Sequence, residues 1–196
     1  MERPQLFSGD EFATKNPMAL GIAINAFQKA KAADNESEYS HTGIIITPDG
    51  TTLEALWTVK SQNIWDAYAG NKVLIVRNTS MTFPVFMAGF SKIREHRDQW
   101  YPAHRLLLQL LGVAKWVHWG RVVCSELTAK FEAGCAEYLG PDRTAGFLRN
   151  WYGVNPDDLT DRWRISRYYT TVFEGVAEGT DLPGTDLKSV PIGETP

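Results

Sequence analysis

The chain has 196 residues, 43% of them hydrophobic, which is enough to bury the core of a single domain. Its net charge of −3 argues against nucleic acid or an anionic membrane as the main partner. No run approaches the roughly 18 consecutive apolar residues of a membrane span, and the first residues lack the basic start and apolar core of a secretory signal, so we expect a cytoplasmic protein.

The first half of the chain alternates apolar runs with turn signals. Its predicted elements are, in order, a strand or extended arm at residues 6–9, a helix at 16–33, strands at 40–47 and 51–59, a short helix at 64–69 and a strand at 72–77. Asn16-Pro17 is a typical helix start, and Pro48-Asp49-Gly50 has the chemistry of a turn. The two strands around that turn are therefore predicted to form a hairpin.

The second half is predicted to be mainly helical. Its elements are, in order, helices at residues 82–97, 104–111, 124–139, 144–151 and 157–163, and a strand at 167–173. Gly140-Pro141 ends the third of these helices. We expect one domain over residues 1–177 and a mobile tail over residues 178–196, because the tail has few large hydrophobic residues.

Cys124 lies at the predicted start of the helix over residues 124–139. The unpaired N–H groups and the dipole of a helix N-terminus favour an anion, and a cysteine placed there tends to be reactive. The alternative is that Cys124 is a small buried hydrophobic residue. Cys135 lies on the same side of the helix, about 16 Å further along, which is too far for a disulfide.

The sequence contains no motif for binding a metal or a nucleotide, and we predict neither a metal nor a cofactor. Its histidines, His41, His96, His104 and His118, are too widely spaced for a zinc pair. His96 lies among charged residues and is predicted to be solvated. A basic group near the end of the chain is either a solvated face or an anchor for an acidic substrate; its members are Arg162, Arg164 and Arg167.

Three segments together carry a resemblance to a known family. They are Gly9-Asp10, Tyr39-Ser40-His41-Thr42-Gly43-Ile44 and Val123-Cys124-Ser125-Glu126-Leu127. In this order they are similar to the permuted papain-like amidases of the YiiX/YaeF type, a branch of the NlpC-type cysteine peptidase superfamily. In that branch the histidine precedes the cysteine, and here Cys124 follows His41 by 83 residues.

The resemblance implies an α+β, circularly permuted papain-like fold, with an antiparallel sheet packed on the helix that bears Cys124. Cys124 would be the nucleophile, His41 the general base and Glu54 the group that orients His41. Tyr39 resembles a tyrosine near the oxyanion site of relatives, and Asp10 would contact a substrate amine. From the residues alone, the alternative for Tyr39 is a core aromatic residue and the alternative for Asp10 is a turn cap.

The function implied is hydrolysis of an amide bond through a thioester. The substrate would be a peptide or a small amide, including cell-wall-derived ones. One alternative is an acyltransferase or lipid hydrolase that uses the same three residues on a lipid-like substrate. Another is a non-catalytic binding module that keeps the fold.

The register of the predicted hairpin decides whether Glu54 reaches His41. A two-residue turn at Asp49-Gly50 places Glu54 opposite Ile45, about 13 Å along the strand from His41. A turn centred on Pro48-Asp49 places it opposite Gly43, at about half that distance. A three-residue loop turns Glu54 to the other face of the sheet. Only the second register supports the three-residue site without a further bulge; otherwise Thr52 or a main-chain carbonyl would orient His41.

Overall fold

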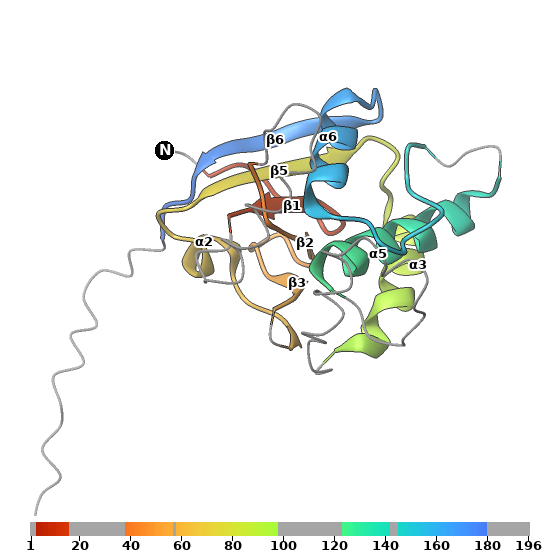
Figure 1. Cartoon of the computed structure of the whole chain (residues 1–196), viewed down its shortest axis with the longest axis horizontal. Coiled ribbons are helices and arrows are strands. Elements are labelled where there is room, and N and C mark those ends of the chain that lie inside the picture. Colours follow the sequence, from red (N-terminus) through yellow and green to blue (C-terminus); the bar gives the residue numbers. More distant parts are fainter. Residues whose placement is uncertain (1–2, 16–37, 57, 98–122, 142–144, 180–196) are drawn as a thin grey trace, which may run out of the picture.

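The computed structural model describes residues 3–15, 38–56, 58–97, 123–141 and 145–179. Within them, six strands form one sheet in the order β4-β3-β2-β1-β5-β6, and every neighbouring pair is antiparallel. The strands are β1 (Glu11–Thr14), β2 (His41–Ile45), β3 (Thr52–Ala55), β4 (Val59–Lys60), β5 (Lys72–Asn78) and β6 (Tyr169–Val176). The helices are α2 (Ile64–Ala67), α3 (Phe83–Ile93), α5 (Cys124–Leu139) and α6 (Pro156–Ile165), with a short 3₁₀ turn, η1 (Arg94–His96). Figure 1 shows their arrangement.

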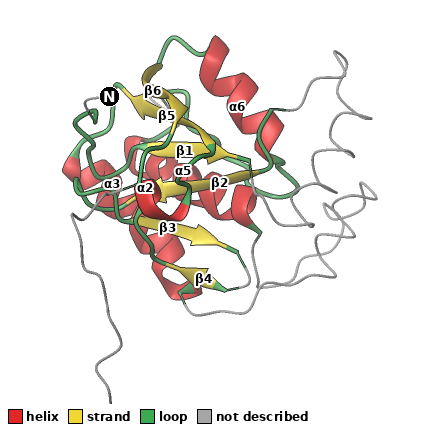
Figure 2. Cartoon of the chain, turned by 90° about the vertical axis from the view of Figure 1, so that its left-hand side faces the viewer, coloured by secondary structure: helices red, strands yellow, loops and turns green. Residues whose placement is uncertain are grey.

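Helices cover both faces of the sheet. One face packs on α3 and α5, with Ile44 and Leu53 of the hairpin against Leu127 and Phe131. The opposite face packs on α2, in a cluster that includes Phe12, Ile45, Ile64, Trp65 and Tyr68. Figure 2 shows α2 in front of the strands and α5 behind them. The described chain is thus an α+β fold with an antiparallel sheet, as the sequence predicted.

The helix that bears Cys124 begins and ends where the sequence predicts, at Cys124 and Leu139. It ends because Gly140 turns out of the helix with a φ of 85°. Its apolar stripe of Leu127, Phe131 and Cys135 is fully buried against the sheet and α3. The hydroxyl of Thr128 also contacts that of Thr42 on β2 at 3.2 Å, which ties the first turns of α5 to β2.

Other predicted elements differ from the structure. The helix predicted over residues 144–151 is wrong, because residues 145–151 form an irregular loop that begins with a turn in which Ala145 and Gly146 have φ values of 49° and 79°. The strand predicted over residues 51–59 is two short strands, β3 and β4. The sequence interpretation also missed β1, since it ended the N-terminal arm at Gly9.

Several predictions concern residues outside the described part of the chain. The helices predicted over residues 16–33 and 104–111, as well as His104 and His118, lie there. So does nearly all of the expected tail, residues 180–196. Among the described residues, no helix is long and apolar enough to cross a membrane.

Candidate active site

Cys124 is the first residue of α5, directly after the N-cap residue Val123. The side chain of Cys124 is buried. Glu126 caps this helix end, since its carboxylate accepts the backbone N–H of Val123 at 3.3 Å and that of Gly153 at 3.2 Å. Because Glu126 bonds these backbone groups, the Cys124 side chain has no capping role. Its thiol lies at the positive end of the helix dipole.

His41 is the first residue of β2 and is fully buried. Its Nε2 lies 2.6 Å from Oε2 of Glu54, a hydrogen-bonded ion pair when the imidazole is protonated. Because Glu54 takes Nε2, Nδ1 is the nitrogen left to bond the thiol of Cys124. Burial alone would lower the pKa of His41, but the charge and hydrogen bond of Cys124, together with Glu54, outweigh burial and raise this pKa to about 10.

The hairpin adopts the register that brings Glu54 to His41. Ile44 pairs with Leu53 and Ile45 with Thr52, so the turn is centred between Pro48 and Asp49. The next pair in this register is Gly43 and Glu54. A Cβ atom built on Gly43 would lie 2.9 Å from Cβ of Glu54 and 2.6 Å from the ring of Phe12. The absence of a side chain at Gly43 thus makes room for Glu54 beside His41.

Glu54 is completely buried, yet three groups donate hydrogen bonds to its carboxylate. The donors are His41, the hydroxyl of Thr52 at 2.6 Å and the hydroxyl of Tyr68. Burial raises the pKa of Glu54, but the hydrogen bond and charge of His41, followed by the bonds of Thr52 and Tyr68, outweigh it and lower this pKa below its usual value. The carboxylate is therefore held in its charged form.

The structure places Tyr39 and Asp10 away from this group. The hydroxyl of Tyr39 donates to Glu174 at 3.3 Å, and its ring packs in a cluster with Leu74 and Trp163. Asp10 accepts the backbone N–H of Phe7 and forms an ion pair with Arg77 at 2.7 Å. Asp10 also lies four residues from the His41 end of β1, about 13 Å along the strand. These contacts are those of a core aromatic residue and a turn cap.

Sequence interpretation missed two groups that belong to this cluster. Tyr68 follows α2 and reaches Glu54 from the sheet face that α2 covers. The sequence suggests Thr52 only as a substitute for Glu54, whereas in the structure Thr52 donates a hydrogen bond to Glu54. Neither residue stands in a motif, because their roles depend on the packing of α2 and on the hairpin register. His96 is a further correction, since it is buried rather than solvated and its ring contacts the amine of Lys130.

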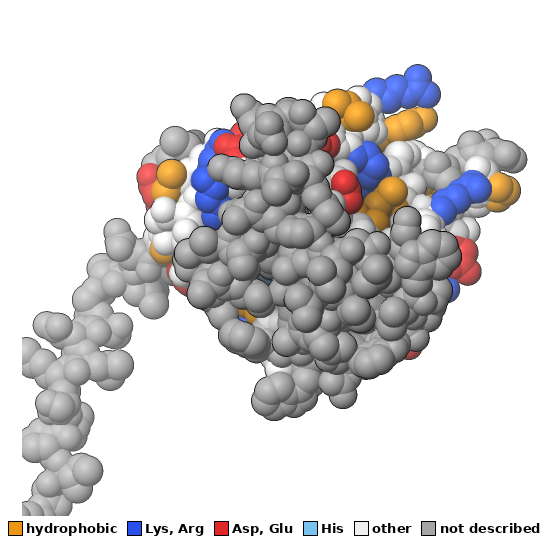
Figure 3. Space-filling model, viewed as in Figure 1, with side chains coloured by type: hydrophobic (Ala, Val, Ile, Leu, Met, Phe, Trp, Pro, Cys, Tyr) orange, Lys and Arg blue, Asp and Glu red, His pale blue; other side chains and the backbone are white. Residues whose placement is uncertain are grey.

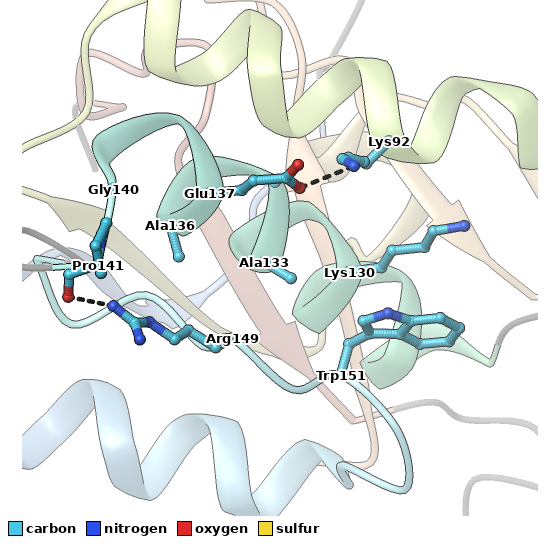
Figure 4. A pocket seen from close by; sticks show the side chains of 10 residues that line it. Lys92, Lys130, Ala133, Ala136, Glu137, Gly140, Pro141, Arg149 and Trp151 are labelled. Atoms are coloured by element: carbon cyan, nitrogen blue, oxygen red, sulfur yellow. Dashed lines mark hydrogen bonds and ion pairs between the residues drawn. The ribbon is translucent and has the colours of Figure 1, made fainter.

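The two described cavities lie elsewhere. One, of about 490 Å³, is on the C-terminal half of α5 and is lined by Lys92, Lys130, Arg149 and Trp151 among others (Figure 4). Each of its cations already has a partner: Glu137 at 2.8 Å for Lys92, Glu95 at 2.9 Å for Lys130, and the carbonyl of Pro141 for Arg149. The other cavity, of about 450 Å³, lies between the hairpin and the end of α3.

Within the part of the chain that the structure describes, no group of three or more His, Cys, Asp or Glu side chains is arranged to hold a metal ion. The described side chains on the face shown in Figure 3 include cations, carboxylates and apolar groups side by side.

Fold and site together define an α+β protein in which a sheet and the N-terminus of a helix bring a thiol, an imidazole and a carboxylate together. A solved structure with a similar fold is that of the metalloprotein YiiX from Escherichia coli O157:H7. The similarity covers 89% of this chain and 99% of that one, with a TM-score of 0.59 and 18% sequence identity. At this identity the likeness is one of fold. No family model matches the chain, and no curated protein matches it.

Proposed function

We propose that the protein is a cysteine hydrolase that cleaves an amide bond through a thioester intermediate. The observation that carries this proposal is the His41–Glu54 pair, whose atoms are 2.6 Å apart, with Cys124 as the second partner of His41. A nucleophile, a base and a group that orients the base are the three parts that such chemistry needs. The fold shared with YiiX and the histidine-first order support a permuted papain-like arrangement.

In the proposed reaction, the Cys124 thiolate attacks the carbonyl carbon of the amide. In this proposal the backbone N–H groups at the start of α5, beginning with that of Cys124, donate hydrogen bonds to the resulting oxyanion. Imidazolium His41 then gives its proton to the leaving nitrogen, the C–N bond breaks and the amine departs. Neutral His41 next takes a proton from water, the hydroxide attacks the thioester, and the acid and the Cys124 thiolate are released.

Glu54 serves this cycle by holding one tautomer and one orientation of His41. With Nε2 bound to Glu54, Nδ1 is the nitrogen that in this proposal exchanges its proton with Cys124. The substrate class that the resemblance suggests is a peptide or a small amide, including cell-wall-derived ones. The contacts of Tyr39 and Asp10 lend no support to a substrate role for either residue.

The test is the rate at which iodoacetamide alkylates Cys124 as a function of pH, in the wild type and in His41→Ala. We expect fast alkylation at pH 6 in the wild type and a large loss at that pH in His41→Ala. His96→Ala is the matched control, because His96 is also a buried histidine but lies outside the site. Mass spectrometry separates Cys124 from Cys135, whose pKa burial raises well above its usual value.

A panel of small amides with added hydroxylamine then tests the thioester. A hydroxamate product that Cys124→Ser abolishes supports the proposal. If the acyl group is transferred to an added acceptor in preference to water, the protein is an acyltransferase and not a hydrolase. A Cys124 that alkylates equally in wild type and His41→Ala would overturn the proposal and favour a binding module.

A further inference from the structure

Tyr68 is the residue that ends α2, a single helical turn that packs over the sheet face on which Glu54 and His41 meet. Asn63 caps the start of this helix, because its side chain accepts the backbone N–H of Trp65 at 3.0 Å. The Tyr68 N–H bonds to the carbonyl of Ile64, which fixes the backbone of Tyr68. Its side chain is almost completely buried.

The hydroxyl of Tyr68 donates to Oε2 of Glu54, the same oxygen that binds Nε2 of His41. Thr52 donates to the other oxygen, Oε1. The carboxylate of Glu54 is thus held at both oxygens, and its rotation would break at least one of these bonds. Thr52 and Glu54 share β3, whereas Tyr68 reaches the carboxylate from a separate element.

The ring of Tyr68 also borders the imidazole. The ring centres of Tyr68 and His41 are 5.9 Å apart, and Phe12 lies 5.8 Å from Tyr68 and 6.1 Å from His41. Burial, and then the charge of Glu54, raise the pKa of Tyr68 well above its usual value, so its hydroxyl keeps its proton and acts as a donor. The amide of Gln62 approaches the hydroxyl oxygen at 3.4 Å.

We propose that Tyr68 is a positioning residue of this site: its hydroxyl holds Glu54 in the charged form and orientation that direct Nδ1 of His41 toward Cys124. The inference rests on the proposed function, because it assigns Tyr68 a role in activating the same thiol. It acts through Glu54 and not on the substrate.

The experiment measures Cys124 alkylation against pH in the wild type, Tyr68→Phe and Tyr169→Phe. Tyr68→Phe removes one hydroxyl and keeps the ring. We expect roughly a tenfold slower alkylation at pH 6, the size of one lost hydrogen bond to a charged group. The acid limb of the profile should move to higher pH, because Glu54 then takes up its proton more readily. Tyr169→Phe also removes a buried hydroxyl bonded to a glutamate, Glu132, outside the site, and should keep the wild-type profile.

A double-mutant cycle with Glu54→Gln separates positioning from a direct role. If Tyr68 acts through Glu54, adding Tyr68→Phe to Glu54→Gln should change the rate by less than about twofold. An unchanged profile in Tyr68→Phe, or an equal loss in both backgrounds, overturns the inference. Loss of the proposed function has a different signature, in which even His41→Ala alkylates as the wild type does.

A measurement on the wild type covers the case in which Tyr68→Phe does not fold. The hydroxyl proton of Tyr68, bonded to a buried carboxylate, should give a slowly exchanging downfield resonance that is absent from Glu54→Ala. A Tyr68 hydroxyl that exchanges freely in the wild type would overturn the inference as well.

Discussion

At the scale of single residues, Gly43 controls whether the hairpin can hold a charged group. Glu54 and the ring of Phe12 both occupy the space that a side chain at Gly43 would fill. His41 lies two residues away on the same face of β2, so Glu54 reaches Nε2 without distortion of the strand. The site therefore depends on a missing side chain as well as on the reactive ones.

Gly43→Ala should lower the free energy of unfolding by about 1–3 kcal/mol, because the added methyl group overpacks a fully buried position. It should also slow the alkylation of Cys124, since Glu54 must move. Urea denaturation and the alkylation rate at pH 6 measure the two effects. Gly179→Ala is the control, because a Cβ atom there meets Ala69 at an ordinary 3.4 Å. A Gly43→Ala protein with the stability and rate of the wild type would contradict the packing described here.

Residues of this site differ in how far sequence alone predicts them. His41 and Cys124 stand in recognisable segments, and their chemistry is local: one opens a strand and the other a helix. The contact of Glu54 with His41 can be predicted only if one particular hairpin register is assumed. Tyr68 was not predictable, because nothing in a short apolar helix says which carboxylate its last tyrosine reaches.

At the scale of elements, Glu132 joins α5 to its surroundings. Its buried carboxylate pairs with Arg162 of α6, and it accepts Nε1–H of Trp163 at 3.1 Å and the hydroxyl of Tyr169 on β6 at 3.0 Å. The backbone N–H of Leu148 adds a fourth bond at 2.8 Å. These bonds join the middle of α5 to α6 and β6.

Arg162→Ala should cost about 3–5 kcal/mol of unfolding free energy, since it leaves Glu132 buried without its counter-charge. Arg164→Ala should cost at most about 1 kcal/mol, because Arg164 pairs with Glu38 and Glu174 at the surface with 46% of its side chain exposed. Chemical denaturation of the two variants measures this contrast. Equal costs would mean that Glu132 finds another partner when Arg162 is lost.

The three arginines of α6 and the turn after it have different partners in the structure. Arg162, Arg164 and Arg167 look like one basic group in the sequence. In the structure Arg162 turns inward to Glu132, Arg164 bridges two surface carboxylates and Arg167 donates to the hydroxyl of Tyr168. Helical spacing separates their directions, but only the position of Glu132 decides which one is buried.

At the scale of the whole molecule, Glu11 makes stability depend on pH. It lies buried on β1 beside Glu132, and its Oε2 has no hydrogen-bond partner among the described groups. Burial first, and then the charge of Glu132, raise the pKa of Glu11 well above its usual value of 4.5. Above about pH 4.5, Glu11 loses its proton in the unfolded chain but keeps it in the folded protein. Glu11 therefore lowers the free energy of unfolding as the pH rises.

Glu11→Gln should therefore remove part of the loss of stability as the pH rises above about 5, a slope of up to about 1.4 kcal/mol per pH unit for one proton. The amide keeps the shape of the protonated carboxyl group and a donor for Glu132. Urea midpoints across this pH range give the slope for the wild type and for the variant. Glu95→Gln is the control, because Glu95 is exposed; equal slopes in wild type and Glu11→Gln would show that Glu11 does not keep its proton.

The elements whose cause is local can be predicted from the amino-acid sequence. These include the full extent of α5, the hairpin of β2 and β3, the apolar strand β5, and the positions of a thiol and a histidine at element ends. The helix wrongly predicted over residues 144–151 failed because left-handed residues at its start broke a favourable apolar spacing.

Which side chains those elements bring together depends on how the elements pack. The hairpin register placed Glu54 against His41, the packing of α2 placed Tyr68 on the same carboxylate, and the packing of α6 buried Arg162 on Glu132. Secondary structure follows from neighbours along the chain, whereas burial of a charge requires partners from distant segments. A buried carboxylate is tolerated only where such partners meet it.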